Sequence, residues 1–114
     1  MKMVPMRTGR SFIGFRWMEC RKQFAATPSG WRSFWAERRA AELFREYDWM
    51  SSWRDWGVSG RGRPWFETER FHKSQRLDMV CRTATAEQKR DYARKALSVA
   101  LDLYEAGWAH RDLK

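Results

Sequence analysis

The sequence has 114 residues, enough for one small domain or a piece of a larger protein, so a complete two-lobed enzyme is excluded. Lysine and arginine outnumber aspartate and glutamate by 23 to 14, which gives a formal charge of +9. This charge suits an anionic partner, such as a nucleotide, a nucleic acid, a phosphorylated glycolipid or an acidic membrane surface.

The N-terminal stretch MKMVPMRTGR lacks the apolar core of a signal peptide, and no apolar run is long enough to span a membrane. Cys20 and Cys81 match no metal or redox spacing, so we expect two buried free thiols in a reducing cytoplasm. These features predict a cytoplasmic protein, with peripheral association at the inner face of the membrane as an option.

The chain has eight tryptophans, and most of them lie among arginines between Trp31 and Trp65. The simplest interpretation is that the rings fill the interior of a small domain while arginine side chains lie over them. Stacking on nucleic-acid bases and contact with a membrane surface are the alternatives.

The first predicted elements are two short strands joined by a turn, because apolar and aromatic residues nearly alternate from Arg10 to Phe24. A helix should then run from Pro28 to about Tyr47, with Thr27 as its N-cap. The spacing of the apolar residues predicts one buried helix face, made of Ala36, Ala40, Leu43, Phe44 and Tyr47.

Trp49, Trp53 and Trp56 keep helical spacing, which predicts two more turns of helix before Gly57 and the loop GVSGRGRP. The aromatic-rich stretch from Pro64 to Phe71 should form a strand. After the ambiguous segment HKSQRLDMVCR, a capping box and a C-terminal glycine predict a helix over 86–106. Thr85 and Gln88 form the capping box, and Gly107 is the C-terminal glycine. The helix should have one apolar face, made of Tyr92, Ala96, Val99, Ala100 and Leu103.

This order of elements predicts an α+β fold: a small antiparallel sheet packed on one helix, followed by a long helix. We expect one unit over 1–75 and the beginning of a second over 76–114.

The sequence ALSVALDLYEAGWAHRDLK places the pentapeptide HRDLK directly after the long helix. In this it resembles the protein-kinase-like superfamily, whose catalytic loop follows such a helix. The likeness is close from Thr85 to Lys114. The stretch RKQFAATPSGWRSFWAERRAAELF is also similar to the small lobe of bacterial lipopolysaccharide core heptose kinases and related bacterial or phage kinase-like proteins.

The resemblance implies a small lobe that binds ATP and a large lobe that carries the catalytic loop. Lys22 would hold the α- and β-phosphates, and Glu37 would pair with this lysine and orient it. Asp112 would be the catalytic base. His110 and Arg111 would brace the loop, and Lys114 would reach the transferring phosphate. The alternatives are that Lys22 is a solvated strand residue, that Glu37 is a charge on the helix surface, and that Asp112 is a charge at a frayed C-terminus.

The stretch TGRSFIGF offers Gly9 and Gly14 for a phosphate loop, but they do not form G-x-G-x-x-G. Glu69 belongs to the stretch that resembles the hinge strand, whose backbone would bind adenine. The Mg²⁺ ligands of kinases follow the catalytic loop, so we expect them beyond Lys114. The chain would then be a truncated phosphotransferase acting on a hydroxyl of a lipopolysaccharide sugar or of a protein Ser or Thr, and inactive alone.

A different class of protein also fits the sequence. The charge of +9 and the clustering of tryptophan with arginine suit a small, non-catalytic binding protein of phage type that contacts nucleic acid or a host protein. In that case the HRDLK ending would carry no catalytic role.

Overall fold

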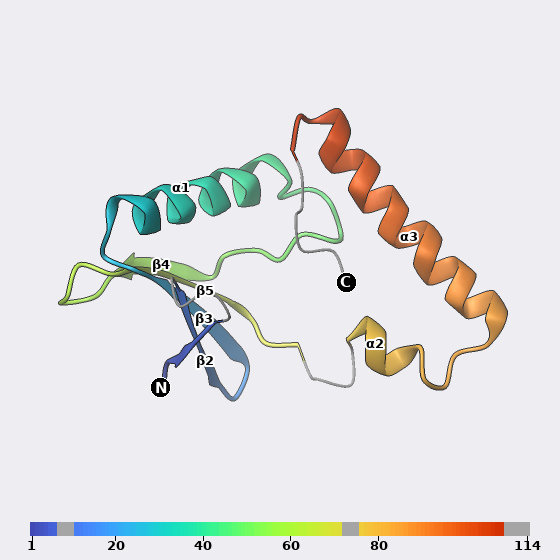
Figure 1. The fold of residues 1–114 in the computed structure, drawn as a ribbon, viewed down its shortest axis with the longest axis horizontal. Coiled ribbons are helices and arrows are strands. Elements are labelled where there is room, and N and C mark those ends of the chain that lie inside the picture. The colour runs from blue at the N-terminus through green and yellow to red at the C-terminus, as the bar shows by residue number, and fades with distance from the viewer. Residues whose placement is uncertain (7–10, 72–75, 109–114) are drawn as a thin grey trace. The chain divides into compact units, whose positions relative to one another are not determined.

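The computed structural model describes residues 1–6, 11–71 and 76–108, and the fold of this part of the chain is α+β (Figure 1). The chain divides into two compact units, Met1–Arg70 and Phe71–Lys114. The first unit therefore ends at Arg70, whereas the sequence suggested a boundary after residue 75. Each unit is described separately below.

The first unit contains an antiparallel sheet of five strands in the order β1-β2-β3-β5-β4. The strands β2 and β3 form the expected hairpin, which turns at Trp17 and Met18, and β5 confirms the expected third strand although it ends at Glu69. The sequence did not predict β1 and β4. The bounds of the strands are β1 Val4–Pro5, β2 Ser11–Arg16, β3 Glu19–Phe24, β4 Asp55–Val58 and β5 Pro64–Glu69.

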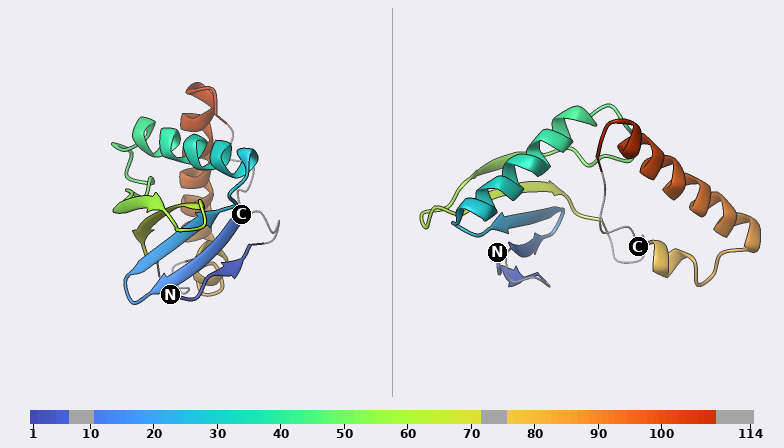
Figure 2. Two further views of the ribbon diagram at one scale, coloured as in Figure 1. Left: turned by 90° about the vertical axis from the view of Figure 1, so that its left-hand side faces the viewer. Right: turned by 45° about the horizontal axis from the view of Figure 1, so that its top comes forward.

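The helix α1, Pro28–Leu43, lies across one face of this sheet (Figures 1 and 2). Its start is as expected: Pro28 is the first helical residue, and the Thr27 hydroxyl accepts a hydrogen bond from the Gly30 amide at 3.1 Å. Gly30 is required here because a Cβ atom would lie only 2.0 Å from the Ala25 carbonyl oxygen. The glycine allows the helix to start immediately after β3.

The helical continuation through Trp49, Trp53 and Trp56 was a wrong prediction. The helix ends at Leu43, two turns follow, and Trp56 lies in β4. Tertiary packing overrides the helical spacing, because Trp53 stacks on Phe66 of β5 with 4.1 Å between the ring centroids. The backbone pairing of Trp56 with Phe66 adds the last strand to the sheet.

The core of the first unit lies between α1 and the sheet and is centred on Phe34, which is completely buried. The expected buried face of α1 was therefore only partly right. Phe44 is buried, but Leu43 is 53% exposed and Tyr47 is 42% exposed. The face that packs on the sheet contains Gly30 and Phe34 instead, four residues apart, because these two residues lie directly above the strands.

Most of the tryptophans of the first unit contribute to its own packing. The Phe34 ring contacts four of them, with centroid distances between 5.3 and 5.9 Å: Trp31, Trp35, Trp53 and Trp56. The Arg38 guanidinium lies 4.5 Å from the centre of the Trp56 ring. The interpretation is therefore right in part: the rings pack on Phe34 and an arginine covers one of them, but Trp35 is 51% and Trp56 is 42% exposed, so they border the core and do not fill its interior. Trp17 is different, because it is 90% exposed.

In the second unit, the described residues form a short helix α2, Leu77–Val80, and the long helix α3, Ala86–Glu105. The predicted capping box of Thr85 and Gln88 is present, and Gly107 adopts a φ of +80° after the helix end. On the predicted apolar face Leu103 is buried, and Tyr92 and Val99 are half-exposed. Across the described residues, no helix combines the length and the apolar character needed to cross a bilayer.

Candidate functional site

The candidate site is built on Lys22, which lies in the middle of β3, and on Glu37, in the third turn of α1. The Lys22 amine donates to Glu37 Oε1 at 2.7 Å. Lys22 shares the helix-facing side of the sheet with Phe24, because residues two apart on a strand point to the same face. The structure confirms the expected contact between a lysine on a strand and a glutamate on the following helix.

The neighbouring Arg21 points to the opposite face of the sheet, as the alternation of a strand requires. There its guanidinium binds Glu67 of β5, with 2.8 Å between Arg21 Nε and Glu67 Oε1, and lies 3.9 Å from the centre of the Trp65 ring. Each of the two adjacent cations thus has its own carboxylate. The site on the helix side therefore contains the amine of Lys22 but not the guanidinium of Arg21.

Both members of the Lys22–Glu37 pair remain partly accessible, since their side chains are 23% and 41% exposed. Glu37 Oε2, in contrast, is buried and has no hydrogen-bond partner among the described residues. An unsatisfied buried acceptor costs about 1–3 kcal/mol. The pair is thus exposed enough to receive a ligand, and it retains one acceptor for a further donor.

A recess of about 340 Å³ lies beside the pair, between β2, β3 and the first turns of α1. Its size falls within the range of small-molecule sites. The lining is mostly small and polar, and Lys22 is its cation. The residues that line it are Ser11, Lys22, Phe24, Ser29, Gly30, Ser33, Ala36 and Glu37.

The sequence analysis missed the serines of this recess, although the sequence contains a signal for two of them. Ser33 precedes Glu37 by one helical turn, so the two share a side of α1. Ser11 pairs with Phe24 in the β2–β3 hairpin. A turn placed at Trp17 and Met18 fixes that register and therefore puts Ser11 on the same face as Phe24 and Lys22.

Two of the other predicted site residues do not join Lys22 and Glu37. Gly14 lies within β2 rather than in a loop and pairs with Arg21, on the face away from Lys22. A Cβ atom there would approach the Met3 sulfur to 2.6 Å, so the glycine makes room for a methionine of this chain. Glu69 is exposed at the end of β5 and pairs with Glu19.

The remaining predicted site residues lie outside the described residues. These are Gly9 of the expected phosphate loop and the four loop residues His110, Arg111, Asp112 and Lys114. Within the described ranges, no three histidine, cysteine, aspartate or glutamate side chains gather to hold a metal ion.

Comparison of the chain with protein-family models, with curated proteins and with solved structures gave no match.

Cys20 lies two residues before Lys22 on β3 and has a shifted pKa. Burial raises the pKa of the Cys20 thiol, while the nearby charges of Arg70 and Lys22 partly oppose this effect. The thiol is therefore protonated near neutral pH and is a poor nucleophile. Cys20 and Cys81 are both free, but each is only partly buried, whereas the sequence suggested buried thiols.

Proposed function

We propose that residues 1–70 are a nucleotide-binding small lobe, and that the chain belongs to an ATP-dependent phosphotransferase of the kinase-like type. The observation that carries the proposal is the ion pair between a lysine on β3 and a glutamate on the helix that follows, at 2.7 Å. In protein kinases a lysine in this strand position holds the ATP phosphates, and a glutamate in this helix position pairs with the lysine.

The energetics of the pair favour a functional role over a structural one. An ion pair that is exposed to this degree contributes only about 0–1 kcal/mol to stability. Lys22 can therefore turn its amine towards a phosphate at little cost to the fold. Glu37 would keep the amine near the recess when no nucleotide is present, and would set its direction when one is bound.

The phosphate contacts follow from the chemistry of the recess. The Lys22 ammonium is a compact positive charge with three donors, and it would bind the α- and β-phosphate oxygens. The hydroxyls of Ser29 and Ser33 line the same recess and can donate to the remaining oxygens. Magnesium, when bound to such a nucleotide, neutralises charge on the β- and γ-phosphates.

The transfer step would use the sequence HRDLK that follows α3. Asp112 would accept the proton of the attacking hydroxyl, and Lys114 would approach the phosphate in transfer. His110 and Arg111 would brace the loop. The acceptor that we propose is a hydroxyl of an anionic substrate, either a lipopolysaccharide sugar or a protein Ser or Thr, and the charge of +9 suits it.

Replacing Lys22 by methionine tests the proposal, because methionine keeps the packing of the stem on Phe24 and removes the charge. Loss of a charge-assisted hydrogen bond should weaken ATP binding about tenfold to a hundredfold. Isothermal titration of ATP and of AMP measures the effect. The wild type should prefer ATP, and Lys22→Met should lose this preference, because AMP lacks the β-phosphate that the amine binds.

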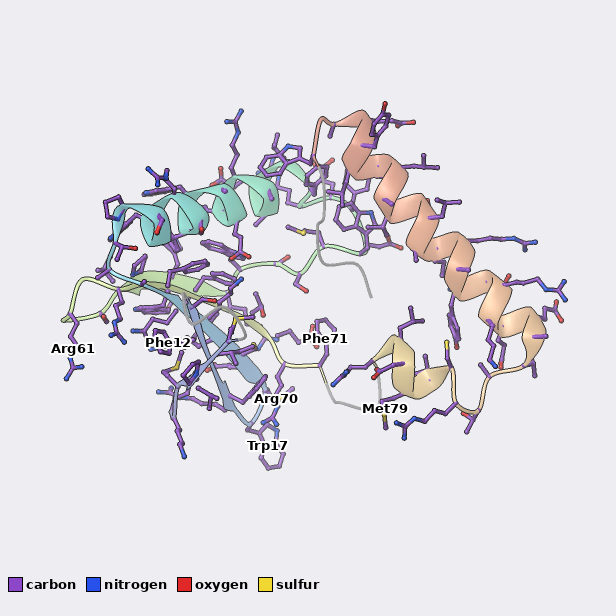
Figure 3. All side chains as sticks on the ribbon, viewed as in Figure 1. Phe12, Trp17, Arg61, Arg70, Phe71 and Met79 are labelled. Atoms are coloured by element: carbon purple, nitrogen blue, oxygen red, sulfur yellow. The ribbon has the colours of Figure 1, made fainter. Side chains whose placement is uncertain are left out.

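Arg61→Met is the matched control, since it removes one positive charge from the loop between β4 and β5 (Figure 3). This variant should bind ATP like the wild type. Equal ATP affinities of wild type and Lys22→Met would overturn the proposal. Equal losses of ATP affinity in Lys22→Met and Arg61→Met would show that ATP binding depends only on net charge, as in a nonspecific basic protein.

A further inference from the structure

The turn of the β2–β3 hairpin, Phe15–Met18, presents an unusual apolar surface at the end of the first unit. Trp17 is 90% exposed, Met18 57% and Phe15 48%. Trp35 and Trp56 are 51% and 42% exposed but still contact Phe34, so Trp17 differs from them in the degree of its exposure. Figure 3 shows Trp17 at the end of the hairpin with Arg70 beside it. Phe15–Met18 is called the hairpin tip below.

The hairpin tip is held in a defined conformation by two arginines from other parts of the sheet. Arg70 donates from Nη1 to the Arg16 carbonyl oxygen at 3.1 Å, and Arg54 donates from Nη1 to the Met18 carbonyl oxygen at 3.3 Å. The Arg70 amide also donates to the Met18 carbonyl oxygen, at 3.1 Å. A rigid hairpin that presents an exposed aromatic ring has the properties of a preorganised anchor, because little conformational freedom is lost on binding.

The charges around the hairpin tip indicate which surface it fits. Arg16 belongs to the hairpin tip, and Arg54 and Arg70 bind its carbonyl oxygens. Glu19 and Glu69 lie at the adjoining strand ends, so three positive charges stand against two negative ones. A guanidinium has five donors, and one bond to a carbonyl leaves others for phosphate. Tryptophan flanked by arginine is the combination that settles at the headgroup level of a bilayer.

We infer that the hairpin tip is a membrane-interface anchor, in which Trp17 and Met18 enter the headgroup region of an anionic bilayer while Arg54 and Arg70 contact lipid phosphates. A bilayer fits better than a nucleic acid, because Trp17 and Met18 are consecutive, exposed apolar side chains at the turn, and Phe15 lies two residues away under the Arg70 guanidinium. Base stacking needs the aromatic ring but leaves a methionine beside it without a partner.

The inference is tested by co-sedimentation of the full chain with vesicles of phosphatidylglycerol and phosphatidylcholine, and with vesicles of phosphatidylcholine alone. The wild type should bind the anionic vesicles more tightly. Trp17→Ser should bind them about tenfold less tightly. Tyr104→Ser is the matched control, since Tyr104 is also an exposed aromatic residue, at 78%, and its loss should leave vesicle binding unchanged.

A second variant, Trp17→Arg, separates apolar insertion from attraction by charge. It adds a positive charge where the ring was, and it should still bind less tightly than the wild type. Tighter binding by Trp17→Arg would overturn the inference, because charge alone would then explain the attraction. The inference also fails if Trp17→Ser binds vesicles like the wild type, or if it loses affinity for a single-stranded oligonucleotide instead. Circular dichroism checks that each variant is folded.

Discussion

Replacing Phe34 by alanine will destabilise the first unit by about 3–5 kcal/mol, the cost of removing a fully buried phenylalanine from a packed core. Phe34 is 0% exposed, and its ring meets Phe24 of the sheet in an edge contact, with 5.8 Å between the centroids. Small domains are stable by only about 5–15 kcal/mol, so this loss is a large fraction of the total. Urea unfolding followed by circular dichroism measures it.

Leu43→Ala is the control for the Phe34 experiment, because Leu43 lies on the same helix but is 53% exposed. It should cost less than about 1 kcal/mol, since little apolar surface is lost from the core. Similar costs for the two substitutions would show that the core is not centred on Phe34, and would contradict the packing of α1 on the sheet.

Removing Glu67 will have the second largest effect, because it leaves the Arg21 guanidinium without its carboxylate. The Glu67 side chain is 9% exposed and that of Arg21 is 24% exposed. Breaking a fully buried pair costs about 3–5 kcal/mol, and the partial exposure of Arg21 should reduce the cost of Glu67→Ala to about 2–3 kcal/mol. Thermal and urea unfolding measure the change.

A second substitution identifies the cause of this loss. Arg21→Met removes the charge and keeps an apolar stem over the Trp65 ring. In the background of Glu67→Ala it should recover part of the stability, because the unpaired charge is gone. If the double variant is less stable than Glu67→Ala, the contact of the Arg21 guanidinium with Trp65 outweighs the cost of the unpaired charge.

The sequence was most informative where local signals and tertiary packing agree. The near-alternation from Arg10 to Phe24 predicts the β2–β3 hairpin, and the capping box at Thr85 predicts the start of α3. These signals involve residues that are close in sequence, so they can be recognised without knowledge of the tertiary structure. The two strands β1 and β4 have four residues or fewer, and they exist because neighbouring strands pair with them.

In the segment from Trp49 to Trp56, the local spacing of tryptophans predicts the wrong secondary structure. Its spacing matches a helix, but Trp53 and Trp56 find better partners in Phe66 and Phe34 across the core. Contacts between residues distant in sequence decide this segment, and no local pattern records them. The same reason explains the buried face of α1, which depends on where the strands lie beneath it.

The candidate site could be predicted in part. The alternation of β3 separates Lys22 from Arg21, and the expected helix brings Glu37 within reach. The recess and the orphaned oxygen of Glu37 could not be predicted, because they depend on the close approach of α1 to Ala25 that Gly30 permits. The prediction that Gly14 belongs to a phosphate loop was wrong for a related reason. This glycine lies in a strand and accommodates methionine side chains that are distant from it in sequence.

Labelling with an acyl phosphate of ATP tests the central claim most directly, because the reagent acylates the lysine that contacts the nucleotide phosphates. The lysines of the chain are Lys2, Lys22, Lys73, Lys89, Lys95 and Lys114, and peptide mass spectrometry distinguishes them. We expect the label on Lys22, with Lys114 as a second labelled lysine if it approaches the phosphate as proposed. The label on Lys22 should be suppressed by excess ATP but not by AMP, and should be weaker in Glu37→Gln. Labelling of the other lysines with Lys22 unmodified, or labelling of Lys22 that excess ATP does not suppress, would contradict the assignment of a nucleotide site to Lys22 and Glu37.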